Sequence, residues 1–132
     1  MSSLLKTLAE KKGFLAKQAA TRELIEEAEL KLGCKFSEEY KEYLSEFGEV
    51  KYYGHELTGI LSSKRLHVVD VTLEERELNP SVPENLYVVE QAGIDGIVVW
   101  QSSTGEIYST APNGQPKKIA KSLNEYINSE NE

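Results

Sequence analysis

Two capped, amphipathic segments between residues 21 and 48 constrain this chain more than any other feature of its sequence. In TRELIEEAELKLG, Thr21 is placed to cap a helix and Gly33 to end it in a left-handed conformation. In SEEYKEYLSEFG, Ser37 and Gly48 take the same two positions. Apolar residues recur at helical spacing in both segments. The sequence therefore predicts a hairpin of two helices.

After this hairpin the hydrophobic period changes. Short runs rich in β-branched and aromatic residues alternate with turn residues, which is typical of strands. The run from Ile97 to Trp100 is apolar throughout, so we expect a strand covered on both faces, with Trp100 in the core. The stretch LHVVDV is too short to distinguish a strand from a helix. The expected strands are residues 55–63, 85–91, 97–101 and 106–110, with a short further piece at 115–120.

The stretch AGIDGIVVWQSSTGEIYST carries three glycines and resembles a loop that binds phosphate. Such a loop requires its glycines to lead into a helix N-terminus, whereas these glycines lead into expected strands. Asp95-Gly96 and Thr104-Gly105 are pairs that tolerate positive φ. Two tight turns are therefore predicted in place of a phosphate site.

Two further pairs have the spacing of a helix capping box. Thr72 and Glu75 predict one or two helical turns over residues 73–78. Ser122 and Glu125 predict a short helix at the end of the chain.

These segments together predict an α+β fold, in which the N-terminal helical hairpin packs on a mostly antiparallel, meandering sheet followed by a short C-terminal helix. We expect one domain over residues 1–132. Residues 1–20 would form an N-terminal helical extension, with a short helix at 3–12, and residues 129–132 a frayed tail.

The net charge of −7 is unevenly distributed along the chain. Residues 1–22 carry +4, residues 23–100 carry −10 and residues 101–132 carry −1. An acidic body repels nucleic acid and membrane phosphates, and it favours association with a basic protein. The alternative is that the acidity serves only solubility.

Other sequence features limit the compartment and the redox chemistry. No apolar run approaches the roughly 20 residues that span a bilayer. The segment MSSLLKTLAEKKGFLAK lacks the apolar centre of a signal peptide, so a cytoplasmic protein without membrane association is expected. The lone Cys34 excludes an internal disulfide and is expected to be a small buried residue.

Candidate catalytic and metal-binding residues are few. His55 with Glu56, and His67 with Asp70, suggest a metal or acid–base site, but they do not form a pair of ligands at helical spacing. No nucleophile elbow is present. We therefore expect no catalytic residue, no bound metal and no cofactor.

Several other residues suggest that the protein binds a protein partner. Tyr52 and Tyr53 follow the helical hairpin and would suit interface anchors, unless they cover the edge of the core. Glu56 either binds the partner or accepts hydrogen bonds from nearby backbone. The candidate partner-binding residues are Tyr52, Tyr53, Glu56, Glu74, Glu77, Glu90 and Asp95.

The acidic members of this set also have a simpler interpretation. Glu74 and Glu77 lie in an acidic cluster that is either a contact surface or a solvated helix face. Glu90 and Asp95 flank the first glycine-bearing turn and would complete an acidic rim.

Four stretches, taken in order, resemble a known family. They are IEEAELKLGCKFSEEYKEYLSEFG, HELTGI, VVDVTLEER, and DGIVVWQSSTGEIYS followed by KSLNEYI. Their succession over residues 21–128 is similar to that of the SUKH superfamily, whose members include bacterial immunity proteins and fungal cell-wall regulators. Ser37 stands where many members have proline.

The resemblance implies a non-catalytic α+β domain. It implies an immunity protein that binds and neutralises a cognate polymorphic toxin, in some cases a nuclease. The acidic body of this chain fits that role independently, because a nuclease surface that grips phosphate is basic and an acidic surface complements it. The alternative within the same family is a regulatory or scaffold module that recruits a cellular protein unrelated to toxins.

Overall fold

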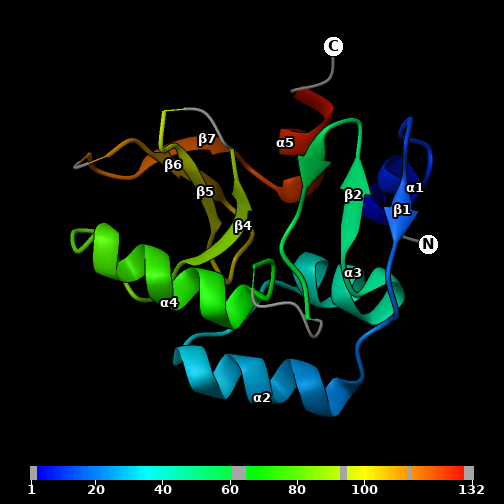
Figure 1. Ribbon diagram of the computed structural model, residues 1–132, viewed down its shortest axis with the longest axis horizontal. Helices are drawn as coiled ribbons and strands as arrows, with labels where there is room; N and C mark the ends of the chain where they lie inside the picture. The colour runs from blue at the N-terminus through cyan, green and yellow to red at the C-terminus, as the bar shows by residue number, and fades with distance from the viewer. Residues whose placement is uncertain (1–2, 61–64, 93–94, 113, 130–132) are drawn as a thin grey trace.

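The computed structural model describes residues 3–60, 65–92, 95–112 and 114–129, and it has the expected α+β fold (Figure 1). The elements are α1 (Ser3–Ala9), β1 (Leu15–Ala16), α2 (Arg22–Leu32), α3 (Glu38–Phe47), β2 (Val50–Tyr52), β3 (His55–Glu56), α4 (Val68–Leu78), β4 (Tyr87–Gln91), β5 (Val98–Gln101), β6 (Ile107–Thr110), β7 (Lys117–Ala120) and α5 (Leu123–Ser129). Among these helices, none has both the length and the apolar character that crossing a membrane requires.

The strands form two antiparallel sheets, with the orders β1-β2-β3 and β4-β5-β6-β7. The sheets meet where the chain leaves β3. There Leu57 forms an isolated bridge with Glu90, and the Thr58 N–H donates to the Val89 carbonyl at 2.9 Å. Strand β4 therefore connects the two sheets.

The expected strand over residues 55–63 is wrong beyond Glu56, where β3 ends. The chain becomes irregular because Gly59 packs against the end of α3. A Cβ atom at Gly59 would lie 2.0 Å from the Gly48 carbonyl oxygen, so only glycine fits this approach. Residues 61–64 of the expected strand lie outside the described part of the chain.

The helical hairpin is confirmed together with its caps. The Thr21 hydroxyl accepts from the Leu24 N–H at 3.2 Å, and Gly33 ends α2 with a φ of 69°. The Ser37 hydroxyl accepts from the Tyr40 N–H at 3.0 Å at the start of α3. Ser37 is buried and also donates to the Gln101 side-chain oxygen at 3.1 Å, so this cap joins α3 to β5.

Helix α4 differs from its prediction. It begins at Val68, where the His67 Nδ1 atom accepts from the Val69 N–H at 3.2 Å, so the ambiguous LHVVDV stretch is mainly helical. Thr72 lies inside the helix, and its hydroxyl accepts from the Val88 N–H of β4 at 3.0 Å instead of capping. The capping-box interpretation of Thr72 and Glu75 is therefore wrong, because packing against the sheet outweighs the local signal.

Both faces of the four-stranded sheet are covered, as expected for the Ile97–Trp100 run. Val98 and the fully buried Trp100 pack with Val71 of α4 on one face. On the other face, Val99 and Ile107 join the larger core that α1, α2, α3 and α5 complete.

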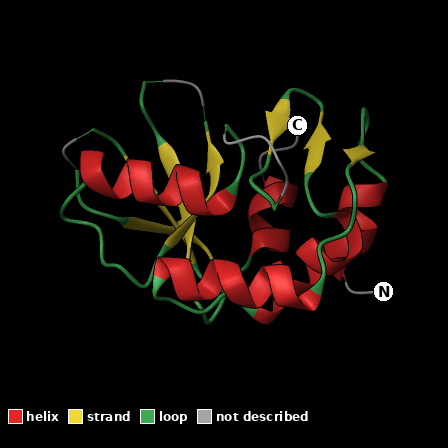
Figure 2. Cartoon of the chain, turned by 60° about the horizontal axis from the view of Figure 1, so that its bottom comes forward, coloured by secondary structure: helices red, strands yellow, loops and turns green. Residues whose placement is uncertain are grey.

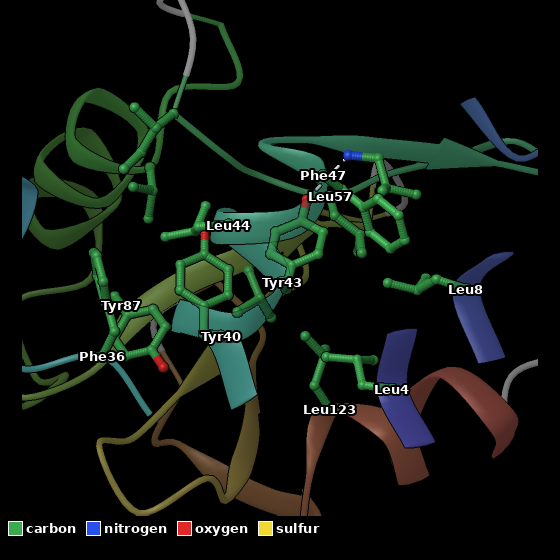
Figure 3. Packing of buried hydrophobic residues seen from close by; sticks show 14 of the residues in the cluster. Leu4, Leu8, Phe36, Tyr40, Tyr43, Leu44, Phe47, Leu57, Tyr87 and Leu123 are labelled. Atoms are coloured by element: carbon green, nitrogen blue, oxygen red, sulfur yellow. Dashed lines mark hydrogen bonds between the residues drawn. The ribbon is translucent and has the colours of Figure 1, made fainter. Parts of the chain in front are cut away.

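Tyrosines of α3 and β4 occupy the centre of the larger core (Figure 3). The Tyr43 hydroxyl donates to the Thr58 carbonyl at 2.7 Å and accepts from the Val50 N–H at 3.0 Å. The Tyr40 hydroxyl lies 2.7 Å from the Thr58 hydroxyl, which donates to the Val88 carbonyl at 2.8 Å. These buried groups are thus satisfied while they tie α3 to both sheets.

The closing helix and the turns agree with the sequence. The Ser122 hydroxyl accepts from the Glu125 N–H at 3.0 Å, and a Glu125 oxygen accepts from the Lys121 N–H at 2.6 Å. Asp95 and Gly96 have φ values of 55° and 71°, as expected for a turn. Helix α1 is shorter than the expected helix at 3–12.

Substituting the buried cap tests the joint between α3 and the sheet. Ser37→Ala removes the bonds to the Tyr40 N–H and to Gln101, and we expect it to lower the free energy of unfolding by about 2 kcal/mol. Thr21→Ala is the matched control, since it removes an exposed cap with one bond and should cost about 1 kcal/mol or less. Urea denaturation measures both. An equal loss in the two variants would contradict the role given to the buried serine.

Candidate functional site

Charge is concentrated in three helices of this protein. Helices α2, α3 and α4 hold twelve acidic and four basic residues, a net charge of −8. The rest of the sequence holds ten acidic and eleven basic residues, a net charge of +1. The acidity is thus a property of the helices and not of the whole surface.

Helices α2 and α4 lie side by side (Figures 1 and 2). Arg76 of α4 fixes this arrangement. Its guanidinium donates to the Leu32 carbonyl at the end of α2 at 3.0 Å and to the Glu84 carbonyl at 2.6 Å. Cys34 is half-buried against the same guanidinium, with a nitrogen–sulfur distance of 3.8 Å, and burial raises the pKa of its thiol.

The outer sides of these two helices form what we call the acidic helical face. It consists of exposed carboxylates interspersed with exposed leucines. Its residues are Glu23, Leu24, Glu26, Glu27, Leu30, Asp70, Leu73, Glu74, Glu77 and Leu78.

The candidate residues Glu74 and Glu77 belong to this face. On α2, Glu26 and Glu27 are paired with neighbouring cations, Glu26 with Arg22 at 3.2 Å and Glu27 with Lys31 at 3.3 Å. Within the described ranges, neither Glu74 nor Glu77 forms an ion pair. The part of the face that α4 contributes therefore has less compensated negative charge.

The leucines of the acidic helical face were missed by the sequence analysis. Leu30 and Leu78 are 83% and 66% exposed, on two neighbouring helices. The helical spacing contained a signal for Leu30, which lies off the stripe of Ile25, Ala28 and Leu32, but none for Leu78, which is seven residues after the buried Val71. Exposed apolar side chains offer a protein partner contact area that carboxylates alone do not provide.

Asp95 lies near one end of this face. A groove of about 610 Å³ separates the end of α4 from the turns of the four-stranded sheet. It is lined by Glu75, Leu78, Asn79, Gln91, Gly96, Ile97, Val98 and Pro112. The exposed Asp95 precedes Gly96 at its border, so the structure brings the first turn close to α4.

The two candidate tyrosines have different environments. Tyr52 is buried and stacks on His55, with ring centroids 4.9 Å apart, which matches the alternative that it covers the edge of the core. Tyr53 forms the tip of the β2–β3 hairpin, is 70% exposed and has a φ of 41°. A bulky residue is strained in this conformation, and Tyr53 is the member of the pair whose side chain is accessible.

Glu90 is not on an acidic rim. It is buried on β4, where it accepts from the Tyr126 hydroxyl at 2.7 Å and contacts the His55 Nδ1 atom at 2.7 Å. His55 thus pairs with Glu90 and not with its neighbour Glu56. These contacts connect β3, β4 and α5, so Glu90 helps to hold the fold together.

Glu56 is held by two cations at the surface. Arg65 donates to both of its oxygens, at 2.7 and 3.1 Å, and the Lys51 amine lies 3.3 Å away. The Arg65 hydrogen bonds lower the pKa of Glu56 to about 2. Neither of the two earlier interpretations, partner contact or backbone acceptor, anticipated this pairing.

Glu49 is a buried carboxyl group that the sequence analysis overlooked. It is 1% exposed, and neither of its oxygens has a hydrogen-bond partner among the described residues. Burial raises its pKa, while the nearby charges of Lys17 and Lys51 oppose the shift. In the described part of the chain, no group of three or more His, Cys, Asp or Glu side chains is arranged to hold a metal ion.

The pKa of Glu49 is raised and that of Glu56 is lowered, so the two residues should make the free energy of unfolding depend on pH in opposite ways. A carboxyl group whose pKa is higher in the folded state than in the unfolded state stabilises the fold at pH values below its unfolded-state pKa. This contribution is lost as the pH rises through its folded-state pKa. Glu49→Gln should therefore increase the free energy of unfolding near neutral pH by about 1 kcal/mol, and the gain should disappear in acid.

Glu56→Gln is the matched control with the opposite sign. Because the pKa of Glu56 is lowered in the folded state, its carboxylate stabilises the fold at pH values above its unfolded-state pKa. This contribution is lost as the pH falls through its folded-state pKa. The variant should be less stable than wild type near neutral pH, with a difference that fades in acid. Urea denaturation at several pH values measures both, and parallel pH profiles for the two variants would contradict the assignment.

Comparison with known proteins agrees with this fold. Residues 1–132 match the family SUKH_5, described as SMI1-KNR4 cell-wall. A crystal structure of a protein from Pseudomonas syringae pv. tomato has a similar fold, with a TM-score of 0.79 and 15% sequence identity, over 98% of this chain and 97% of that chain. A search of curated proteins finds no match. The resemblance seen in the sequence is thus confirmed, and the chain belongs to the SUKH_5 (SMI1-KNR4) family.

Proposed function

We propose that this protein is a non-catalytic immunity protein that binds a cognate toxin domain and neutralises it. The acidic helical face is the observation that carries the proposal. It combines carboxylates, some of them without an ion pair in the described part of the chain, with exposed leucines on two helices that Arg76 holds together. Such a surface complements a basic protein surface and offers apolar contact area within it.

A toxin that acts on nucleic acid fits this surface. Proteins that grip phosphate present lysine and arginine, so an acidic protein can cover the same groups by charge complementarity. Inhibition then requires no chemistry from the immunity protein, because occupying the basic surface excludes the substrate. We place this interaction in the cytoplasm.

A regulatory or scaffold module is the second candidate function. The description of the matched family as cell-wall favours it. The two functions differ in their partner, since the first requires a toxin encoded beside this gene and the second requires a cellular protein. Purification of this protein with the neighbouring gene product distinguishes them: a complex at micromolar concentration and low salt supports the first, and its absence under these conditions contradicts it.

Charge reversal tests the surface itself. Glu74→Lys with Glu77→Lys replaces two exposed carboxylates of α4, and we expect association with the toxin to slow by about tenfold at low salt. The effect should shrink as ionic strength rises, because salt screens exposed charges. Stopped-flow association kinetics at several salt concentrations measure it.

Glu10→Lys with Glu46→Lys is the matched control, since it changes the net charge equally at two exposed residues outside the acidic helical face. Equal slowing by both pairs would show that net charge, and not this face, governs association. Glu90 is left unchanged in this test because it is buried.

A further inference from the structure

The groove at the end of α4 shares Leu78 with the acidic helical face but differs from it chemically. Its walls are formed by apolar groups, which are Leu78, Ile97, Val98 and Pro112. Its remaining lining includes a single carboxylate, Glu75, and the amides of Asn79 and Gln91. A negatively charged group between apolar walls is the feature that needs a physical explanation.

Glu75 is only 8% exposed, and the groups that hold its carboxylate are uncharged. Its two oxygens accept from the Asn79 amide at 3.2 Å and from the Gln91 amide at 2.5 Å. Both donors are neutral, and Glu75 forms no ion pair with any residue that the structure describes. The neighbouring Arg76 donates to carbonyl groups of Leu32 and Glu84 instead.

A carboxylate in this environment is stabilised when a positive charge approaches it. Hydrogen bonds from amides orient the oxygens but leave the charge uncompensated, and partial burial strengthens attraction to a cation. Lysine and arginine carry an aliphatic stem that packs along apolar walls while the charged end reaches a carboxylate.

We propose that this groove is a binding site for a lysine or arginine side chain of the partner, with the stem between Leu78 and Ile97 and the charged end at Glu75. The proposal rests on the proposed function and deepens it, because it names the partner side chain that binds next to the acidic helical face. Asp95, at the border of the groove, adds a second negative charge near its entrance.

The site can be tested without knowing the toxin. N-acetyl-arginine amide is titrated into the isotopically labelled protein and followed by NMR, with N-acetyl-citrulline amide as the neutral probe of nearly equal shape. We expect saturable shifts at Leu78, Gln91 and Val98 with a dissociation constant on the order of a few millimolar. The neutral probe should bind at least about fivefold more weakly, because it lacks the charge-assisted contact.

Variants at the exposed Leu78 separate charge from packing without disturbing the core. Leu78→Lys should weaken binding of the arginine probe by about tenfold or more, whereas Leu78→Glu, which removes the same apolar wall without adding a positive charge, should weaken it much less. Leu30→Lys, at the most exposed leucine of α2, is the matched control and should leave binding unchanged. Equal binding of the two probes, no saturable shift in the groove, or an equal loss in the Leu30 control would each overturn the proposal.

These outcomes are distinct from the fate of the proposed function. Binding of the arginine probe with the expected pattern supports the groove even if no toxin complex forms. Absence of probe binding overturns the groove even if the toxin binds elsewhere on the acidic helical face.

Discussion

The hydrogen bonds around Thr58 are the constraint on which the rest of this structure depends. Tyr40 and Tyr43 of α3 both bind this residue, and Thr58 in turn donates to two consecutive backbone carbonyls of β4. A buried hydroxyl without a partner costs free energy, so helix, threonine and strand must occupy their observed positions together. The two sheets therefore meet at one place, and α3 lies across both.

The placement of the acidic residues follows from this frame. Because the sheet is covered by α4 on one face, the outer side of α4 must face solvent, and Arg76 holds α2 beside it through the Leu32 carbonyl. Carboxylates that are distant in sequence thus form one surface. The same packing leaves Glu75 at the edge of the sheet, where it is buried and meets two amides but, among the described residues, no cation.

The helical hairpin was predictable because its signals are local. Thr21, Ser37 and the two terminal glycines bind backbone within one turn of each helix, so their effect does not depend on the rest of the chain. The start of α4 was not predictable in this way. Thr72 has capping spacing, but its hydroxyl binds Val88 of β4, a partner 16 residues away.

The sequence by itself determined the fold class, the helical hairpin, the turns at Asp95 and Gly105, and the acidic character of the central segment, since these depend on periodicity, backbone preference and charge count. Only the tertiary structure decided which candidates reach the surface. Tyr52 and Glu90 are buried, whereas Tyr53, Glu74, Glu77 and Asp95 are exposed. Tyr52 and Tyr53 are adjacent residues of the same type, but Tyr52 ends β2 and faces the core, whereas Tyr53 forms the tip of the hairpin and faces solvent. The residue type does not distinguish them, because their exposure depends on where the strand ends and on what packs against it.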